Sequence, residues 1–200
     1  SNASTGGVDS RKTLVSSRTS YAIGEEILYD IVFEGIRASF DNVRIVDALP
    51  ANMEFVRLVS FDADNFERSG GGAVTLISSP AAEDTGSLEF NFGDVSTIDT
   101  APTAPKPTIS IRIGVRAQNM AGNIQGLNLQ NVGNIISGTP GITISSSSAD
   151  ITVIEPELKI DFAAADSSDP TEFNSFLPES FVITVDHDAP SMNVAHSLKC

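Results

Sequence analysis

The sequence predicts an all-β protein built mainly from a two-sheet antiparallel β-sandwich. The strongest observation is apolar alternation at every second position, as in Ile109, Ile111, Ile113 and Val115, with polar residues or Gly between them. Gly- and Pro-rich segments separate such stretches at short intervals, and no segment has a sustained helical stripe. Many short strands with one apolar face each favour two packed sheets, because a single sheet would leave an apolar face in water.

The same pattern identifies the strands in order. We expect strands around Lys12–Val15, Ile27–Phe33, Val43–Val46, Met53–Ser60, Ala73–Ile77, Leu88–Phe92, Ile109–Val115, Leu127–Ile136, Ile142–Ser145 and Ile151–Ile154. The segments 61–72 and 100–107 are expected to be loops, and the serine run 145–148 is expected to be a turn.

The apolar residues of these strands form the predicted core. They are Ile27, Tyr29, Ile31, Phe33, Val43, Ile45, Phe55, Leu88, Phe90, Phe92, Ile109, Ile111, Ile113 and Val115.

Two segments about 150 residues apart have matching patterns, which indicates a tandem repeat. Residues 25–33 lead to Asn42-Val43, and residues 178–185 lead to Asn193-Val194, each with a Lys-containing strand upstream. We therefore expect a leader at 1–11, a sandwich module at 12–155 and a partial second β module at 156–200. Ser1-Asn2-Ala3 is typical of a scar left by tag removal, and we expect the whole leader to be disordered.

The charge balance limits the kinds of partner that the chain can bind. The net charge is −14, which argues against a basic surface for nucleic acid. No apolar run is long enough for a membrane span, so we expect no membrane insertion by this segment.

Several motifs point to a known family. These are Gly24-Glu25, the Tyr29 strand, Asn42-Val43, Asp47 and Leu49-Pro50, followed by the Asn131–Asn134 segment and a last strand running into Glu155-Pro156. The chain resembles the bacterial surface "conserved repeat domain" (domain of unknown function 11), an immunoglobulin-like repeat found in tandem in large secreted, wall-attached and fimbria-like proteins. The Glu34-Gly35-Ile36 segment departs from that pattern.

The resemblance also implies a covalent cross-link. Some related fimbrial modules carry an isopeptide bond between a first-strand Lys and a last-strand Asn, assisted by a buried acid. Lys12 would supply the amine, Asn131 or Asn134 the amide, and Asp47 or Glu26 the acid. The alternative is that Lys12 is an exposed edge residue that discourages aggregation.

Calcium is the candidate cofactor, and no other is expected. Asp62, Asp64, Asn65 and Glu67 place oxygen atoms at close spacing, and Asp186 and Asp188 do so in the second module. The alternative is that these residues form solvated turns.

Catalysis is not expected. The two histidines, His187 and His196, lie outside the first module, and no nucleophile elbow is present. We therefore expect a non-enzymatic structural or adhesive module of a large extracellular bacterial surface protein, acting as a stalk or spacer. The alternative is a β-sandwich that binds a glycan or protein, with calcium as an aid. Expected partners are neighbouring repeats of the same protein, and a host or cell-surface protein or glycan.

Overall fold

The fold is all-β, as predicted. The computed structural model describes residues 7–154, 158–164 and 181–187, and this part of the chain contains no helix. The chain divides into two compact units, Ser1–Ile154 and Glu155–Cys200.

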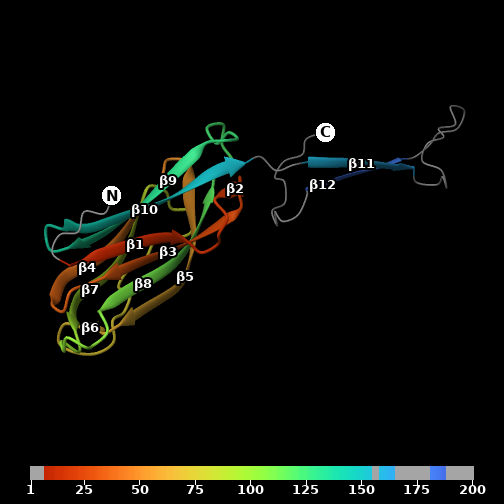
Figure 1. The fold of residues 1–200 in the computed structure, drawn as a ribbon. Coiled ribbons are helices and arrows are strands. Elements are labelled where there is room, and N and C mark those ends of the chain that lie inside the picture. Colours follow the sequence, from red (N-terminus) through yellow and green to blue (C-terminus); the bar gives the residue numbers. More distant parts are fainter. Residues whose placement is uncertain (1–6, 155–157, 165–180, 188–200) are drawn as a thin grey trace, which may run out of the picture. The chain divides into compact units, whose positions relative to one another are not determined.

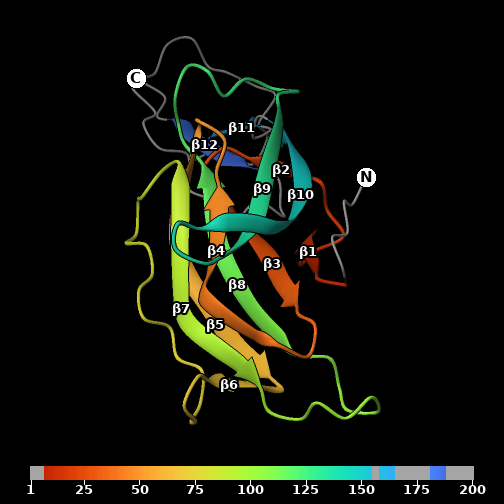
Figure 2. The same cartoon turned by 90° about the vertical axis from the view of Figure 1, so that its left-hand side faces the viewer.

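The first unit is a sandwich of two sheets (Figures 1 and 2). The four-stranded sheet has the order β1 (Asp9–Leu14), β3 (Glu26–Glu34), β8 (Thr108–Ala117) and β5 (Met53–Asp64). The six-stranded sheet has the order β2 (Ser20–Ala22), β10 (Ile142–Ile154), β9 (Asn128–Ser137), β4 (Ser39–Ala48), β7 (Ser87–Thr97) and β6 (Phe66–Arg68). The predicted sandwich is therefore confirmed. One pair departs from the antiparallel expectation, because β2 runs parallel to the end of β10.

The core lies between the sheets, and every predicted core residue is buried. Aromatic contacts join the two layers: Phe55 packs edge-to-face on Phe90 with ring centroids 5.9 Å apart, and Phe61 stacks on Phe92 at 5.3 Å. Fully burying an apolar side chain of this size contributes on the order of 2 kcal/mol. The alternating strands therefore supply the main stabilisation of the sandwich.

The expected turn at residues 145–148 is wrong. These serines lie in the middle of β10, where Ser145 pairs with Ile135 and Ser148 with Val132 of β9. The ladder with β9 satisfies their backbone groups, and this tertiary pairing overrides the local turn preference of serine.

Three other expectations differ from the structure. Residues 73–77 do not form a continuous strand, because they make only isolated pairings: Ala73 bridges to Glu67, and Ile77 N donates to the Asn91 carbonyl (2.7 Å). The expected loop at 61–72 instead contains the end of β5 and all of β6. β1 also begins at Asp9, before the boundary expected at residue 12.

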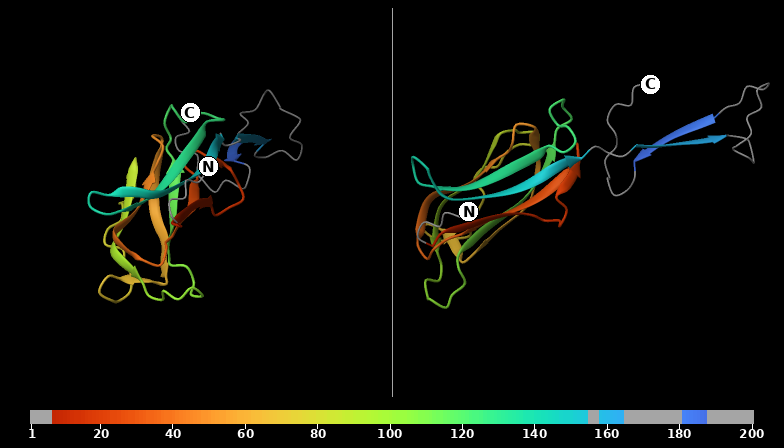
Figure 3. Two further views of the ribbon diagram at one scale, coloured as in Figure 1. Left: turned by 60° about the vertical axis from the view of Figure 1, so that its left-hand side comes forward. Right: turned by 45° about the horizontal axis from the view of Figure 1, so that its top comes forward.

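The order of the edge strands brings the first and last parts of the unit together. β1 lies beside β10 and β9 of the opposite sheet (Figure 3). Ser10 of β1 and Ser145 of β10 share a buried hydrogen bond of 2.7 Å between their hydroxyl oxygens. Polar side chains thus enter the core along this seam.

β1 begins at one end of the sandwich, and β10 ends at the other (Figure 1). In the second unit the structure describes one antiparallel pair, β11 (Leu158–Ala164) with β12 (Phe181–His187). Lys159 lies opposite Asp186 in this pair.

Candidate functional site

Three polar side chains from three strands meet in the core between the sheets. Lys12 comes from β1 of the four-stranded sheet, whereas Asp47 and Asn131 come from the adjacent strands β4 and β9 of the six-stranded sheet. Asp47 lies opposite Gly133 in the β4–β9 ladder, so Asn131 is its diagonal neighbour on the same face. We call Lys12, Asp47 and Asn131 the triad.

The Asp47 carboxylate bridges the other two side chains. Its Oδ1 accepts a hydrogen bond from Lys12 Nζ within an ion pair, and its Oδ2 accepts one from Asn131 Nδ2 at 3.1 Å. The side chains of the ion pair are fully buried, and Asn131 is 0% exposed. A buried charge is very costly without a partner, so these contacts hold the three groups in place.

Gly133 provides the space through which Lys12 reaches Asp47. A Cβ atom at Gly133 would lie 3.5 Å from Lys12 Cδ and 3.3 Å from Ile31 Cγ2. The aliphatic stem of Lys12 therefore passes over a position that has no side chain. A larger residue there would compete with the stem for the same volume.

Burial shifts both members of the ion pair toward their neutral forms. Desolvation lowers the pKa of Lys12 from 10.5 to about 8, although the attraction of Asp47 opposes it. Desolvation raises the pKa of Asp47, although Lys12 and Asn131 oppose it. Transfer of one proton from Lys12 to Asp47 would give a neutral amine, which is the nucleophilic form of lysine.

The triad therefore contains the parts needed for amide exchange. Lys12 offers an amine, Asn131 offers a side-chain amide, and the carboxyl of Asp47 contacts both nitrogen atoms. A carboxyl in this place can take a proton from the attacking nitrogen and give one to the leaving nitrogen.

The alternative residues for this site lie elsewhere. Asn134 is on β9 but on the opposite face from Asn131, following the alternation of the strand. Glu26 lies on the outer face of β3, where it accepts hydrogen bonds from Arg57 Nε (2.8 Å) and Nη2 (3.1 Å). The structure brings together Lys12, Asp47 and Asn131 alone among the residues considered for the cross-link.

The residues considered for calcium are placed differently. Asp62 and Asp64 are exposed on β5, and Glu67 lies in β6. Asn65 fastens the loop after β7: its Nδ2 donates to the carbonyls of Asp99 (3.0 Å) and Pro105 (2.7 Å).

Within residues 7–154, no three His, Cys, Asp or Glu side chains form a group that could hold a metal ion. Asp186 lies in β12, and Asp188 is outside the described residues. Calcium binding stays a prediction.

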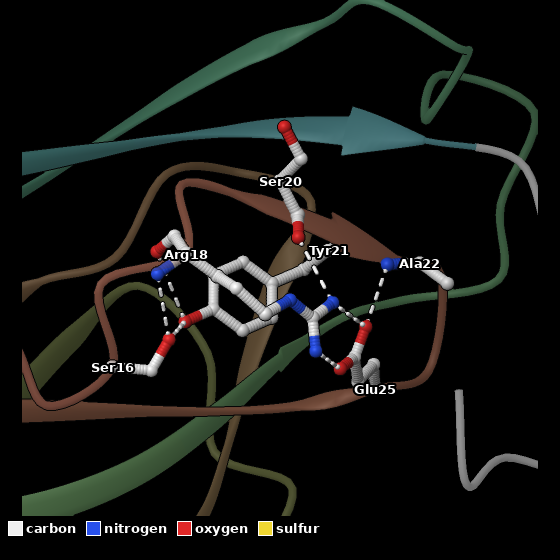
Figure 4. Close-up of polar contacts among 6 residues, drawn as sticks. All are labelled: Ser16, Arg18, Ser20, Tyr21, Ala22 and Glu25. Carbon is white, nitrogen blue, oxygen red and sulfur yellow. Dashed lines mark hydrogen bonds and ion pairs between the residues drawn. The ribbon is translucent and has the colours of Figure 1, made fainter. Parts of the chain in front are cut away.

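A second polar cluster fixes β2 beside the last residues of β10 (Figure 4). Arg18 forms a two-pronged ion pair with Glu25, at 2.6 and 3.0 Å, and its guanidinium lies 4.7 Å from the Tyr21 ring centroid. Glu25 also accepts a hydrogen bond from Ala22 N (2.9 Å), and the Tyr21 hydroxyl contacts Ser16 Oγ (3.0 Å). This cluster stabilises β2, the strand that pairs with the last residues of β10.

The sequence pattern does not indicate two further residues that contact the triad. The role of Gly133 depends on the register between β4 and β9, which its own strand does not specify. Tyr29 has the pattern of an apolar core residue, yet its ring centroid lies 4.8 Å from Lys12 Nζ. The signal available for Tyr29 was its position, since Lys12 pairs with Ile31 and Tyr29 is therefore its diagonal neighbour on the adjacent strand.

Comparison with known proteins finds distant similarity only. No family model matches the chain, and no curated protein shows significant sequence similarity to it. Similar solved structures include the full-length major pilin SpaD of Corynebacterium diphtheriae, with 13% identity, 78% of this chain and 35% of that chain covered, and a TM-score of 0.42. The 35 kDa C-terminal fragment of the major pilin GBS80 of Streptococcus agalactiae has 12% identity, coverage of 79% and 64%, and a TM-score of 0.49.

The sporulation control protein Spo0M of Bacillus subtilis is also similar, with 10% identity, coverage of 75% and 50%, and a TM-score of 0.37. The chain spans less than two thirds of each of these three structures. Similarity at this level assigns neither a family nor a function.

The described residues include no helix of the length and apolarity that a membrane crossing requires.

Proposed function

We propose that the first unit is a non-enzymatic structural module closed by an isopeptide bond between Lys12 Nζ and Asn131 Cγ, with Asp47 as the proton carrier. The observation that carries this proposal is the buried Asp47 carboxylate, which contacts the amine of Lys12 and the amide nitrogen of Asn131 at the same time. Burying an ion pair costs desolvation free energy, and apolar residues of similar size stabilise a core as well or better. A role in chemistry would explain why the ion pair is present.

The reaction balances within the triad. A proton moves from the Lys12 ammonium to Asp47, and the neutral amine attacks Asn131 Cγ. Asp47 then gives its proton to Nδ2, the bond between Cγ and Nδ2 breaks, and ammonia leaves. The new amide nitrogen returns its surplus proton to Asp47, which ends as a neutral carboxyl group. Burial favours that final state, because it raises the pKa of Asp47 and no charged lysine remains.

The cross-link would join the two sheets at the seam where β1 meets β9. It would prevent β1, an edge strand held by β3 alone within its sheet, from peeling away. Since β1 begins at one end of the sandwich and β10 ends at the other, such a module adds its length to a chain of modules (Figure 1). This geometry supports a role as stalk or spacer.

The wider setting follows from the same properties. We place the module in a large extracellular bacterial surface protein, with neighbouring repeats as its first partners. The net charge of −14 suits a well-solvated surface there. A covalent bond that forms without an external oxidant would stabilise a unit that has no cysteine with which to form a disulfide, since the single cysteine of the chain is Cys200.

Intact mass of the folded protein and its variants tests the proposal. The wild type should be lighter than its sequence mass by about 17 Da, the mass of the ammonia displaced by the amine nucleophile. Lys12→Ala, Asn131→Ala and Asp47→Asn should keep their full sequence masses. The control variants Lys106→Ala and Asn134→Ala, which alter residues outside the triad, should show the same loss as the wild type. Folded wild-type protein at its full sequence mass would refute the cross-link.

A further inference from the structure

One polar atom of the triad, and one of the tyrosine whose ring lies 4.8 Å from Lys12 Nζ, make no hydrogen bond. Among the described residues, neither the hydroxyl of Tyr29 nor Oδ1 of Asn131 has a hydrogen-bond partner, and both atoms are buried. One is a donor without an acceptor, and the other is an acceptor without a donor. An unsatisfied buried polar group typically costs on the order of 1–3 kcal/mol, so two at one site require an explanation.

Packing explains the ring of Tyr29 but not its hydroxyl. The residue is 0% exposed, its ring faces Lys12 Nζ, and a phenylalanine would fill the same volume. The other tyrosine of the first unit shows the usual arrangement, because the Tyr21 hydroxyl is bonded to Ser16 Oγ.

We propose that the Tyr29 hydroxyl is the hydrogen-bond donor that stabilises Oδ1 of Asn131 when Lys12 attacks. This inference rests on the proposed isopeptide reaction and adds a residue to it. In the resting site the carboxyl of Asp47 is engaged with the two nitrogen atoms, Lys12 Nζ and Asn131 Nδ2. The amide oxygen is therefore left for another donor.

The chemistry requires such a donor at one moment. As the new bond between Nζ and Cγ forms, the electrons of the carbonyl move onto Oδ1, and this oxygen becomes an oxyanion. A buried oxyanion needs a hydrogen-bond donor already in place, and removal of one such donor typically slows acyl transfer by about 10²–10³-fold. Hydrogen bonds of this kind are often long before the reaction and shorten as charge develops.

The electrostatic surroundings keep Tyr29 in the form that donates. Desolvation raises the pKa of Tyr29, and the nearby carboxylates of Asp47 and Asp150 raise it further. The phenol therefore stays protonated across the physiological range. It serves as a donor and not as a base for Lys12, a role that Asp47 fills.

The test is the rate of bond formation in Tyr29→Phe, with Tyr21→Phe as the matched control. Unfolded chain that intact mass shows to be unreacted is refolded by dilution, quenched at intervals in acid, and weighed for the loss of about 17 Da. Tyr29→Phe should fold, with equal or higher stability, and should form the bond at least ~10-fold more slowly than the wild type. Tyr21→Phe should react at the wild-type rate. A Tyr29→Phe protein that reacts as fast as the wild type would overturn the role of the hydroxyl.

A second measurement does not depend on how Tyr29→Phe folds. Since the chain has two tyrosines, 3-fluorotyrosine incorporated into Tyr21→Phe labels position 29 alone. The more acidic fluorophenol should change the rate of bond formation, and an unchanged rate would count against the proposal. If the wild type never loses ammonia, the isopeptide itself is refuted. If the wild type reacts and the Tyr29 variants react at the same rate, the isopeptide stands and only the role of Tyr29 is refuted.

Discussion

Lys12 on β1 and Asp47 on β4 form an ion pair that crosses the interior from one sheet of the sandwich to the other. Both side chains are fully buried, and burial moves both pKa values toward the neutral forms. The hydrogen bonds of Asp47 hold the Lys12 amine beside Asn131, and in the proposed reaction the loss of solvent favours the neutral amine that attacks. The same contact accounts for the placement of Lys12 and, under the proposal, for its reactivity.

Loss of the cross-link should lower stability strongly. A covalent closure of a loop of more than 100 residues removes unfolded-chain entropy worth about 5 kcal/mol in the chain-entropy model. Asn131→Ala should therefore lower Tm by roughly 10–20 °C for a domain of this size. Differential scanning calorimetry measures this, with Asn134→Ala on the opposite face of β9 as the control. Equal losses in the two variants would contradict the prediction.

The pH dependence of stability should separate the cross-linked protein from the unlinked one. Without the cross-link, the pKa of Lys12 is lowered by burial from 10.5 to about 8 in the folded protein, and Asn131→Ala should keep this lowered pKa because Lys12 stays buried beside Asp47. Between these values the unfolded chain binds more protons, so the free energy of unfolding should rise as pH increases from about 8 to 10.5. In the wild type Lys12 is an amide and does not titrate, so this rise should be missing. Urea denaturation at a series of pH values tests it, and parallel curves for the two proteins would argue against the bond.

The open position at Gly133 should limit the rate of the reaction. In Gly133→Val the new side chain would meet Lys12 Cδ and Ile31 Cγ2, and the lysine stem would be displaced from Asp47. We expect bond formation at least ~10-fold slower than in the wild type, because small misplacements of a reacting group are costly. The refolding and mass assay measures it. Asn134→Val, on the other face of the same strand, should react normally; a normal rate for Gly133→Val would show that the gap is not needed.

Mechanical pulling should reveal which part of the fold bears load. With Lys12 joined to Asn131, force applied at the two ends of the first unit bypasses residues 13–130. Only residues outside this loop, 9–11 of β1 and 132–154, can unravel, which limits the gain in length to about 90 Å at about 3.5 Å per residue. Lys12→Ala should extend by roughly 500 Å. Single-molecule force spectroscopy distinguishes these lengths, and a long extension of the wild type would contradict the cross-link.

Much of the fold could be predicted because most core strands alternate apolar and polar residues. The pattern of Ile109–Val115 and of Ile27–Phe33 identifies strands with one buried face, and these became β8 and β3 with the predicted residues inside. The serine run of β10 was not predictable in this way. Its local preference is for turns, and the partner that holds it extended, β9, is set by tertiary pairing.

The site was predictable in its residue types but not in its choice among them. Lys12, Asp47 and Asn131 were among the expected residues, since Lys12 and Asn131 fall on predicted strands and Asp47 directly follows one. Asn131 and Asn134 differ by an odd number of positions, so only the register decides which one faces the core. Gly133 lies opposite Asp47 because of the register between β4 and β9, and Tyr29 lies beside Lys12 because of the register between β1 and β3. The pattern of a single strand does not specify either register.

Peptide mapping of the folded wild type tests the cross-link most directly. Trypsin cleaves after Arg11, Arg18, Arg116 and Lys159, and it does not cleave after a lysine whose amine is an amide. The isopeptide predicts one branched product in which residues 12–18 are joined to residues 117–159, with fragmentation placing the junction at Lys12 and Asn131. Recovery of 13–18 and 117–159 as separate peptides of unmodified mass would contradict it.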